Sequence, residues 1–280
     1  MTCFKADRWF LQAAFAVGLF FGVAPTVAAQ PASLLDFFAG QGCAIGPTTR
    51  NAALAVGYEP KAIDALTETA RRNPNTVMTG GWLVLPSDVC EIRIPAVANE
   101  LKLTDPEVRK SISAPDTYAA DGDPGCFLDR ERLFQELRRT RSWDDDKFNL
   151  EYIRLIGGSI ASGDMTFYTD NPLRTPVGFQ LITGECADVP KISEINRSHA
   201  FLIELFDPLV RANAAHIVCE SGASLITPEF PGIAQTLSGI EVPNAWLAME
   251  IQMIAMGAGW YEGMSMTNKG TPRPPLCHYE

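Results

Sequence analysis

TVMTGGWLVLPSDVCEIRI, residues 76–94, is the segment in which strand patterns replace helix patterns. It divides into three short runs, residues 76–78, 82–85 and 89–94, separated by a Gly-Gly pair and by a Pro-Ser-Asp turn. Such pairs and turns are typical of connections between strands. The segment therefore predicts a small antiparallel sheet of three strands.

Three short helical patterns precede this segment. They cover residues 34–38, 47–57 and 60–73, and prolines stand where the second and third helices begin. Proline is common in the first turn of a helix because its missing N–H has no partner there. Three short helices followed by a small sheet is the order of elements in a winged-helix module. Residues 30–97 resemble such a module in topology, and no sequence motif adds to this likeness.

The rest of the chain is predicted to be mainly helical, which makes the fold class mainly α with a small β element. Residues 98–124 are interpreted as a linker with one short helix from Thr104, and residues 125–280 as a disulfide-linked helical domain. Predicted helices cover residues 129–139, 144–162, 191–206, 207–217, 230–237 and 244–256. Short strands or extended loops are expected at residues 167–168 and 177–182.

Residues 1–29 have the pattern of a cleaved secretory signal peptide. Lys5 and Arg8 form a positive start, residues 9–23 an apolar core, and Val27-Ala28-Ala29 the small residues that signal peptidase requires. A membrane-spanning helix needs roughly twenty apolar residues, so a retained anchor is the weaker alternative. We therefore expect a soluble exported protein, periplasmic or extracellular, without stable membrane insertion after signal cleavage.

Six cysteines follow the signal region, and an even number in an exported chain predicts disulfides. On the predicted strand 89–94, Cys90 points inward because side chains alternate, and Cys43 lies just after the first helix. We expect these two cysteines to pair. The other four are Cys126, Cys186, Cys219 and Cys277. They allow three connectivities, among which we favour pairing of sequence neighbours.

The charge of the chain indicates which partners it binds. The chain holds 23 Lys and Arg against 33 Asp and Glu, a formal net charge of −10 at pH 7. Polyphosphate binding needs clustered Lys and Arg, and acidic residues outnumber basic ones in both halves. Nucleic acid and anionic lipid are therefore not expected, and an envelope protein or polymer is left as the partner class. No cofactor is predicted.

Three side chains are candidates for acid–base chemistry. Glu250 interrupts an apolar helix, His199 lies on the apolar face of another helix, and Glu262 follows two aromatic residues. A buried carboxyl group has a raised pKa and can act as a general acid. The alternative for Glu250 and His199 is a satisfied polar contact in the core.

Two further groups have a binding and a structural interpretation. Trp260 and Tyr261 follow a Gly-Ala-Gly break and are interpreted as an exposed aromatic contact, with core packing as the alternative. A second set has the ligand types of a structural zinc site and consists of His216, Cys219, Cys277 and His278. For this set a disulfide is favoured over zinc because the expected compartment is oxidising.

The sequence favours a non-enzymatic binding or envelope-interaction protein. It contains no GxSxG, SxxK, HExxH, GxxxxGK or GxGxxG motif. The alternative is a periplasmic hydrolase of envelope polymers or peptides that uses Glu250, His199 and Glu262 as acid and base. A cleft that joins two of these side chains would favour the hydrolase, whereas burial or separation would favour binding.

Overall fold

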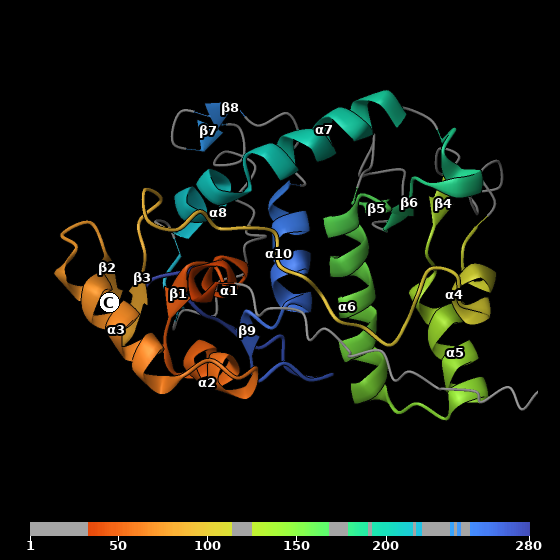
Figure 1. Cartoon of the computed structure of the whole chain (residues 1–280). Helices are drawn as coiled ribbons and strands as arrows, with labels where there is room; N and C mark the ends of the chain where they lie inside the picture. The colour runs from red at the N-terminus through yellow and green to blue at the C-terminus, as the bar shows by residue number, and fades with distance from the viewer. Residues whose placement is uncertain are drawn as a thin grey trace, which may run out of the picture. The chain divides into compact units, whose positions relative to one another are not determined.

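The computed structural model describes residues 33–113, 125–167, 179–189, 192–214, 217–219, 236–237, 240–241 and 247–280. The predicted signal peptide, residues 1–29, lies outside these ranges. The described chain is mainly helical with small antiparallel sheets, as the sequence predicts (Figure 1). Within these ranges no helix combines the length and the hydrophobicity needed to cross a membrane.

The three predicted N-terminal helices are confirmed. The elements of this part are α1 (Leu34–Gly40), β1 (Ala44–Ile45), α2 (Pro47–Ala55), α3 (Pro60–Arg72), β2 (Val77–Thr79) and β3 (Trp82–Val84). The side chain of Ser33 caps α1 by accepting a hydrogen bond from the Asp36 N–H at 3.0 Å. Proline stands at the start of α2 and of α3, where a missing N–H has no cost.

The N-terminal sheet has the strand order β1-β3-β2, and both pairs are antiparallel. Its third strand is therefore β1, and the prediction of a strand over residues 89–94 is wrong. Side chains from a later helix bind this segment instead. The Arg211 guanidinium donates to the carbonyls of Leu85 and Cys90, each at 2.8 Å, and Asp207 accepts from the Ile92 N–H at 2.7 Å. These contacts take the place of ladder partners.

The later elements follow the predicted helices closely. They are α4 (Pro106–Lys110), β4 (Cys126–Phe127), α5 (Arg130–Arg141), α6 (Asp145–Ser162), β5 (Met165–Thr166), β6 (Gln180–Leu181), η1 (Gly184–Cys186), α7 (Ile192–Glu204) and α8 (Phe206–Ala214). The C-terminal part contains β7 (Thr236–Leu237), β8 (Ile240–Glu241), α10 (Leu247–Gly257), β9 (Tyr261–Glu262) and β10 (Thr271–Pro272). The predicted helix 230–237 is wrong at its end, because residues 236–237 form the strand β7, which pairs antiparallel with β8. A Ser-Gly turn signal separates the two strands in the sequence.

Helices α6 and α10 lie side by side and form the centre of the core (Figure 1). A Cβ atom at Gly157 would lie 2.3 Å from the Met253 carbonyl oxygen, so only glycine permits this approach. One hydrophobic cluster contains Phe38 and Ile63 as well as Ile156 and Ile254. Residues 32–280 thus form one compact unit, and the domain limits drawn from the sequence stay a prediction.

Three disulfides link distant parts of the chain. They join Cys43 to Cys90, Cys126 to Cys186 and Cys219 to Cys277. The predicted presence of disulfide bonds is thereby confirmed, and the pairs are those that the sequence favours. The third bond holds the C-terminal segment against residues 217–219, where the Cys219 N–H also donates to the His278 carbonyl at 2.8 Å.

Candidate functional site

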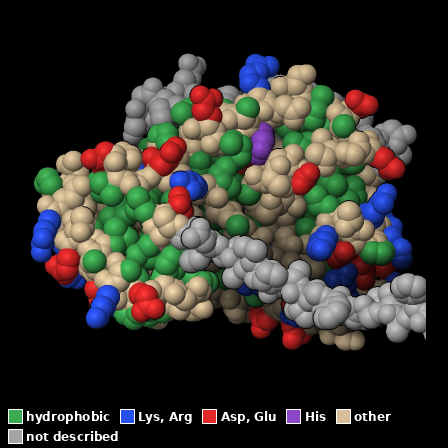
Figure 2. All heavy atoms as spheres, viewed as in Figure 1, with side chains coloured by type: hydrophobic (Ala, Val, Ile, Leu, Met, Phe, Trp, Pro, Cys, Tyr) green, Lys and Arg blue, Asp and Glu red, His purple; other side chains and the backbone are tan. Residues whose placement is uncertain are grey.

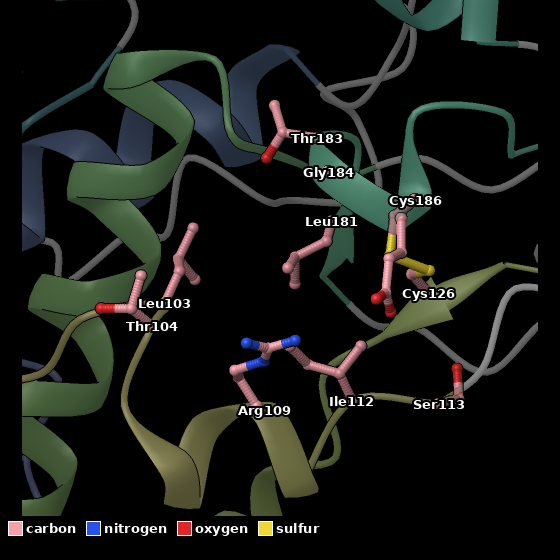
Figure 3. A pocket seen from close by; sticks show the side chains of 11 residues that line it. Leu103, Thr104, Arg109, Ile112, Ser113, Cys126, Leu181, Thr183, Gly184 and Cys186 are labelled. Atoms are coloured by element: carbon pink, nitrogen blue, oxygen red, sulfur yellow. A yellow bond between two sulfur atoms is a disulfide. The ribbon is translucent and has the colours of Figure 1, made fainter.

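A pocket of about 530 Å³ lies beside the Cys126–Cys186 disulfide (Figure 3). Its apolar walls are formed by Leu103, Ile112, Leu181 and the disulfide itself. Its polar lining includes Thr104, Arg109, Ser113, Thr183 and Glu185. This volume falls in the range of small-molecule sites, which combine apolar walls with a few polar groups.

Backbone hydrogen bonds hold the frame of the pocket. Cys126 of β4 is paired with Leu181 of β6, and the disulfide ties β4 to the η1 turn. The Ser113 hydroxyl donates to the Gly125 carbonyl at 2.8 Å and accepts from the Phe127 N–H at 2.9 Å. Both hydrogen bonds of that hydroxyl are made to the backbone and no general base among the described residues contacts it, so its role is structural and it is not an activated nucleophile.

Arg109 extends from α4 into the pocket (Figure 3). The acidic residues beside it are already occupied, because Arg141 donates to Asp105 at 2.9 Å and to Glu107 at 3.0 Å. The hydrogen bond from Arg141 lowers the pKa of Glu107 to about 2. Within the described ranges, the Arg109 guanidinium makes no ion pair.

Glu185 contributes the negative charge of the pocket. It lies exposed in η1, which begins after Thr183 with Gly184 at a φ of +62°. Among the residues that the structure describes, none forms an ion pair with the Glu185 carboxylate. Arg109, which lines the same pocket, does not pair with it either. The pocket therefore presents a guanidinium and a carboxylate that are separate from each other and free to bind a ligand.

Glu250 is a core residue and not part of a cleft. Its side chain is 1% exposed, and Oε1 accepts hydrogen bonds from the Thr166 hydroxyl at 2.7 Å and from the Phe167 N–H at 2.9 Å. Burial raises its pKa to about 7, although both hydrogen bonds act in the opposite direction. This carboxyl group therefore links α10 to β5, which agrees with the alternative interpretation of Glu250 as a satisfied polar contact in the core.

The other two acid–base candidates lie on different elements. His199 on α7 is half-buried, and burial lowers its pKa although Asp164 opposes the shift. Glu262 on β9 is exposed and stands opposite Thr271. In the part of the chain that the structure describes, no hydrogen bond or ion pair joins any two of Glu250, His199 and Glu262.

Trp260 and Tyr261 do not form the exposed contact predicted for them. Their exposed fractions are 0% and 7%, and the Trp260 ring lies beside the Phe206 ring and the Arg273 guanidinium, while Tyr261 stands opposite Pro272 of β10. The Arg273 guanidinium lies 5.7 Å from the Trp260 ring centre and 5.3 Å from that of Trp82. Sequence reasoning missed Arg273, whose only signal was its position in a proline-rich tail.

The residues of the zinc alternative have structural roles. Cys219 and Cys277 are bonded to each other, which leaves neither sulfur as a thiolate ligand. Nδ1 of His278 lies 3.0 Å from the Ala214 carbonyl, and His216 falls outside the described residues. Across the described ranges, no cluster of three or more His, Cys, Asp or Glu side chains has the arrangement of a metal site.

Arg109 and Glu185 were not found from the sequence. One charged residue in a short helix and another in a turn are common on any surface, and they are far apart in the chain. The pairing of β4 with β6 and the Cys126–Cys186 disulfide bring their segments to one pocket.

No protein-family model, curated protein or solved structure matches this chain.

Proposed function

We propose that the chain is a non-enzymatic binding protein that acts outside the cytoplasm and contacts a component of the cell envelope. The pocket beside Cys126–Cys186 carries this proposal, because it presents Arg109 and Glu185 without ion pairs among the described residues. Charged groups above an apolar wall are typical of ligand sites. The three disulfides support export, since such bonds persist in oxidising compartments.

The proposal includes a winged-helix-like module at residues 30–97 that contacts protein or polymer and not DNA. The order of helices and strands and the β1-β3-β2 sheet support this assignment. Acidic and basic side chains are interspersed on the visible face, without the single-sign field that a polyanion partner would require (Figure 2).

The hydrolase alternative has its best support in Glu250, whose pKa of about 7 suits a general acid. However, a general acid must lie within hydrogen-bond reach of a substrate. The Glu250 carboxyl group is 1% exposed and already accepts bonds from Thr166 and Phe167. The binding role is therefore the better explanation.

Co-sedimentation with isolated envelope fractions tests the binding role. We expect the wild-type protein to sediment with wall polymer or membranes. Arg109→Glu should reduce the bound fraction at least tenfold, because it reverses the cation of the pocket. Arg72→Glu makes the same charge change at the exposed end of α3 and serves as the control. Equal binding by the two variants, or no binding by the wild type, would contradict the proposal.

A further inference from the structure

We infer that the pocket beside Cys126–Cys186 binds a zwitterion, either a free amino acid or a short peptide with an apolar side chain. Arg109 would bind the ligand carboxylate and Glu185 the ligand ammonium group. This inference rests on the proposed binding function and names its ligand class.

The positive end of the pocket is suited to a carboxylate. A guanidinium presents paired N–H donors in one plane, which match the two oxygens of a carboxylate. Arg109 reaches into the pocket between Leu103 and Ile112 (Figure 3). The nearby acids Asp105 and Glu107 bind Arg141, so they leave the charge of Arg109 available.

The negative end selects against a simple anion. Glu185 lines the same pocket, and its carboxylate would repel a ligand that carries only negative charge. Arg109 would in turn repel a ligand that carries only positive charge. A ligand with both charges satisfies both side chains, which is the property of an amino acid or a peptide with free ends.

The apolar wall of the pocket indicates the ligand side chain. It consists of Leu103, Ile112, Leu181 and the disulfide, all of which are apolar. Burial of an apolar side chain against them adds affinity in proportion to the area removed from water. The volume of about 530 Å³ accommodates a free amino acid or a short peptide.

The frame of the pocket is organised before any ligand arrives. The disulfide joins β4 to η1, which carries Glu185, and the Ser113 hydroxyl ties the end of the α4 segment to β4. A rigid frame reduces the ordering that binding would otherwise require. Arg109 on α4 and Glu185 on η1 are therefore held by separate elements that these contacts fix in place.

Calorimetric titration with chemically blocked peptides tests the inference. The probes are L-leucine, L-leucyl-L-leucine, its N-acetyl derivative and its C-terminal amide. We expect at least one free zwitterion to bind, and each blocked dipeptide to bind at least tenfold more weakly than L-leucyl-L-leucine if the dipeptide is the ligand. If only leucine binds, leucinamide and N-acetyl-leucine replace the blocked dipeptides.

Variants assign each charge to its side chain by a double-mutant cycle. In Arg109→Gln the free ligand and its amide should bind equally, and in Glu185→Gln the free ligand and its N-acetyl form should bind equally. Arg72→Gln, which is outside the pocket, should retain the full difference. Circular dichroism checks that each variant folds, as expected for substitutions at exposed positions.

Two results would overturn the inference. One is no heat and no competition from any probe with the folded wild-type protein. The other is an Arg109→Gln effect of equal size for the free ligand and for its amide. If either occurs while envelope binding still depends on Arg109, the ligand class is wrong and the binding function stands. If envelope binding is absent or does not depend on Arg109, both the binding function and the ligand class are contradicted.

Discussion

At the scale of single residues, two buried ionisable groups are accommodated in different ways. Burial raises the pKa of Glu250 to about 7, so its carboxyl group keeps its proton at mildly acidic pH and loses it through the neutral range. Burial lowers the pKa of Arg273 to about 10, and the guanidinium stays charged. Its donors bind the Gln41 backbone and side-chain oxygens and the Pro274 carbonyl, and two tryptophan rings flank it.

Glu250 should make the stability of the protein depend on pH. The carboxyl pKa is 4.5 in its ordinary environment and about 7 in the folded chain. Its stabilising contribution is therefore complete below the lower value and is lost as the pH rises through the higher one. The loss between about pH 5 and about pH 8 is about 2.5 kcal/mol, since one pKa unit corresponds to about 1.4 kcal/mol and part of the loss has occurred by about pH 5.

The Glu250→Gln variant checks this dependence, because its amide keeps an acceptor for Thr166 and Phe167 but does not titrate. Urea unfolding of both proteins at the two pH values gives the difference in unfolding free energy. We expect the unfolding free energy of the wild type to fall relative to that of the variant as the pH rises. An unchanged difference would show that the carboxyl group does not titrate in this window.

At the scale of elements, the contact between α6 and α10 depends on one glycine. A Cβ atom at Gly157 would lie 2.3 Å from the Met253 carbonyl oxygen, and a backbone atom cannot move aside without shifting its helix. The neighbouring Gly158 faces only side chains, with the nearest atom, Asn99 Nδ2, at 3.3 Å. Both glycines lie in α6, but only Gly157 packs against the backbone of another helix, so Gly158 is a matched control for it.

Substitution of each glycine by alanine separates packing from helix propensity. Both changes gain about 1 kcal/mol of propensity. We expect Gly157→Ala to destabilise the protein by about 3 kcal/mol, because overpacking against backbone forces α6 and α10 apart. Gly158→Ala should change stability by no more than about 1 kcal/mol. Thermal or urea unfolding that ranks the two variants equally would contradict the proposed close approach.

The segment 89–94 shows where element prediction failed. Its alternation was correct, since Cys90 and Ile92 are buried while Glu91 is exposed. An alternating pattern describes which side chains face inward, and it does not determine what binds the backbone. Arg211 and Asp207 bind it here, and both come from α8, more than a hundred residues later.

At the scale of the whole molecule, the three disulfides connect segments that are 47, 60 and 58 residues apart. Chain-entropy arithmetic assigns about 4 kcal/mol of stability to each bond. Two of them lie within the N-terminal and middle parts, and the third anchors the tail that covers Trp260. Such bonds persist in oxidising compartments, which is consistent with the proposed export.

Paired cysteine-to-serine variants distinguish the roles of these bonds. Removal of Cys43–Cys90 or of Cys126–Cys186 should each lower the unfolding free energy by about 4 kcal/mol. Only removal of Cys126–Cys186 should also weaken leucyl-leucine binding, because that bond forms a wall of the pocket. Urea unfolding and calorimetry measure the two effects. Equal loss of binding in both variants would indicate a general loss of structure.

The sequence by itself determined most of the helices and the mainly α class, because these follow from local patterns, and it indicated that the cysteines form disulfides. It left three connectivities open for the last four cysteines, and the structure decided among them. It also assigned Glu250 to an apolar helix, where the structure buries it. Tertiary structure alone decided that Trp260 is covered by Arg273 and that Arg109 shares a pocket with Glu185. The physical reason is that these contacts join residues far apart in the chain, and no local pattern records which distant segment completes a surface.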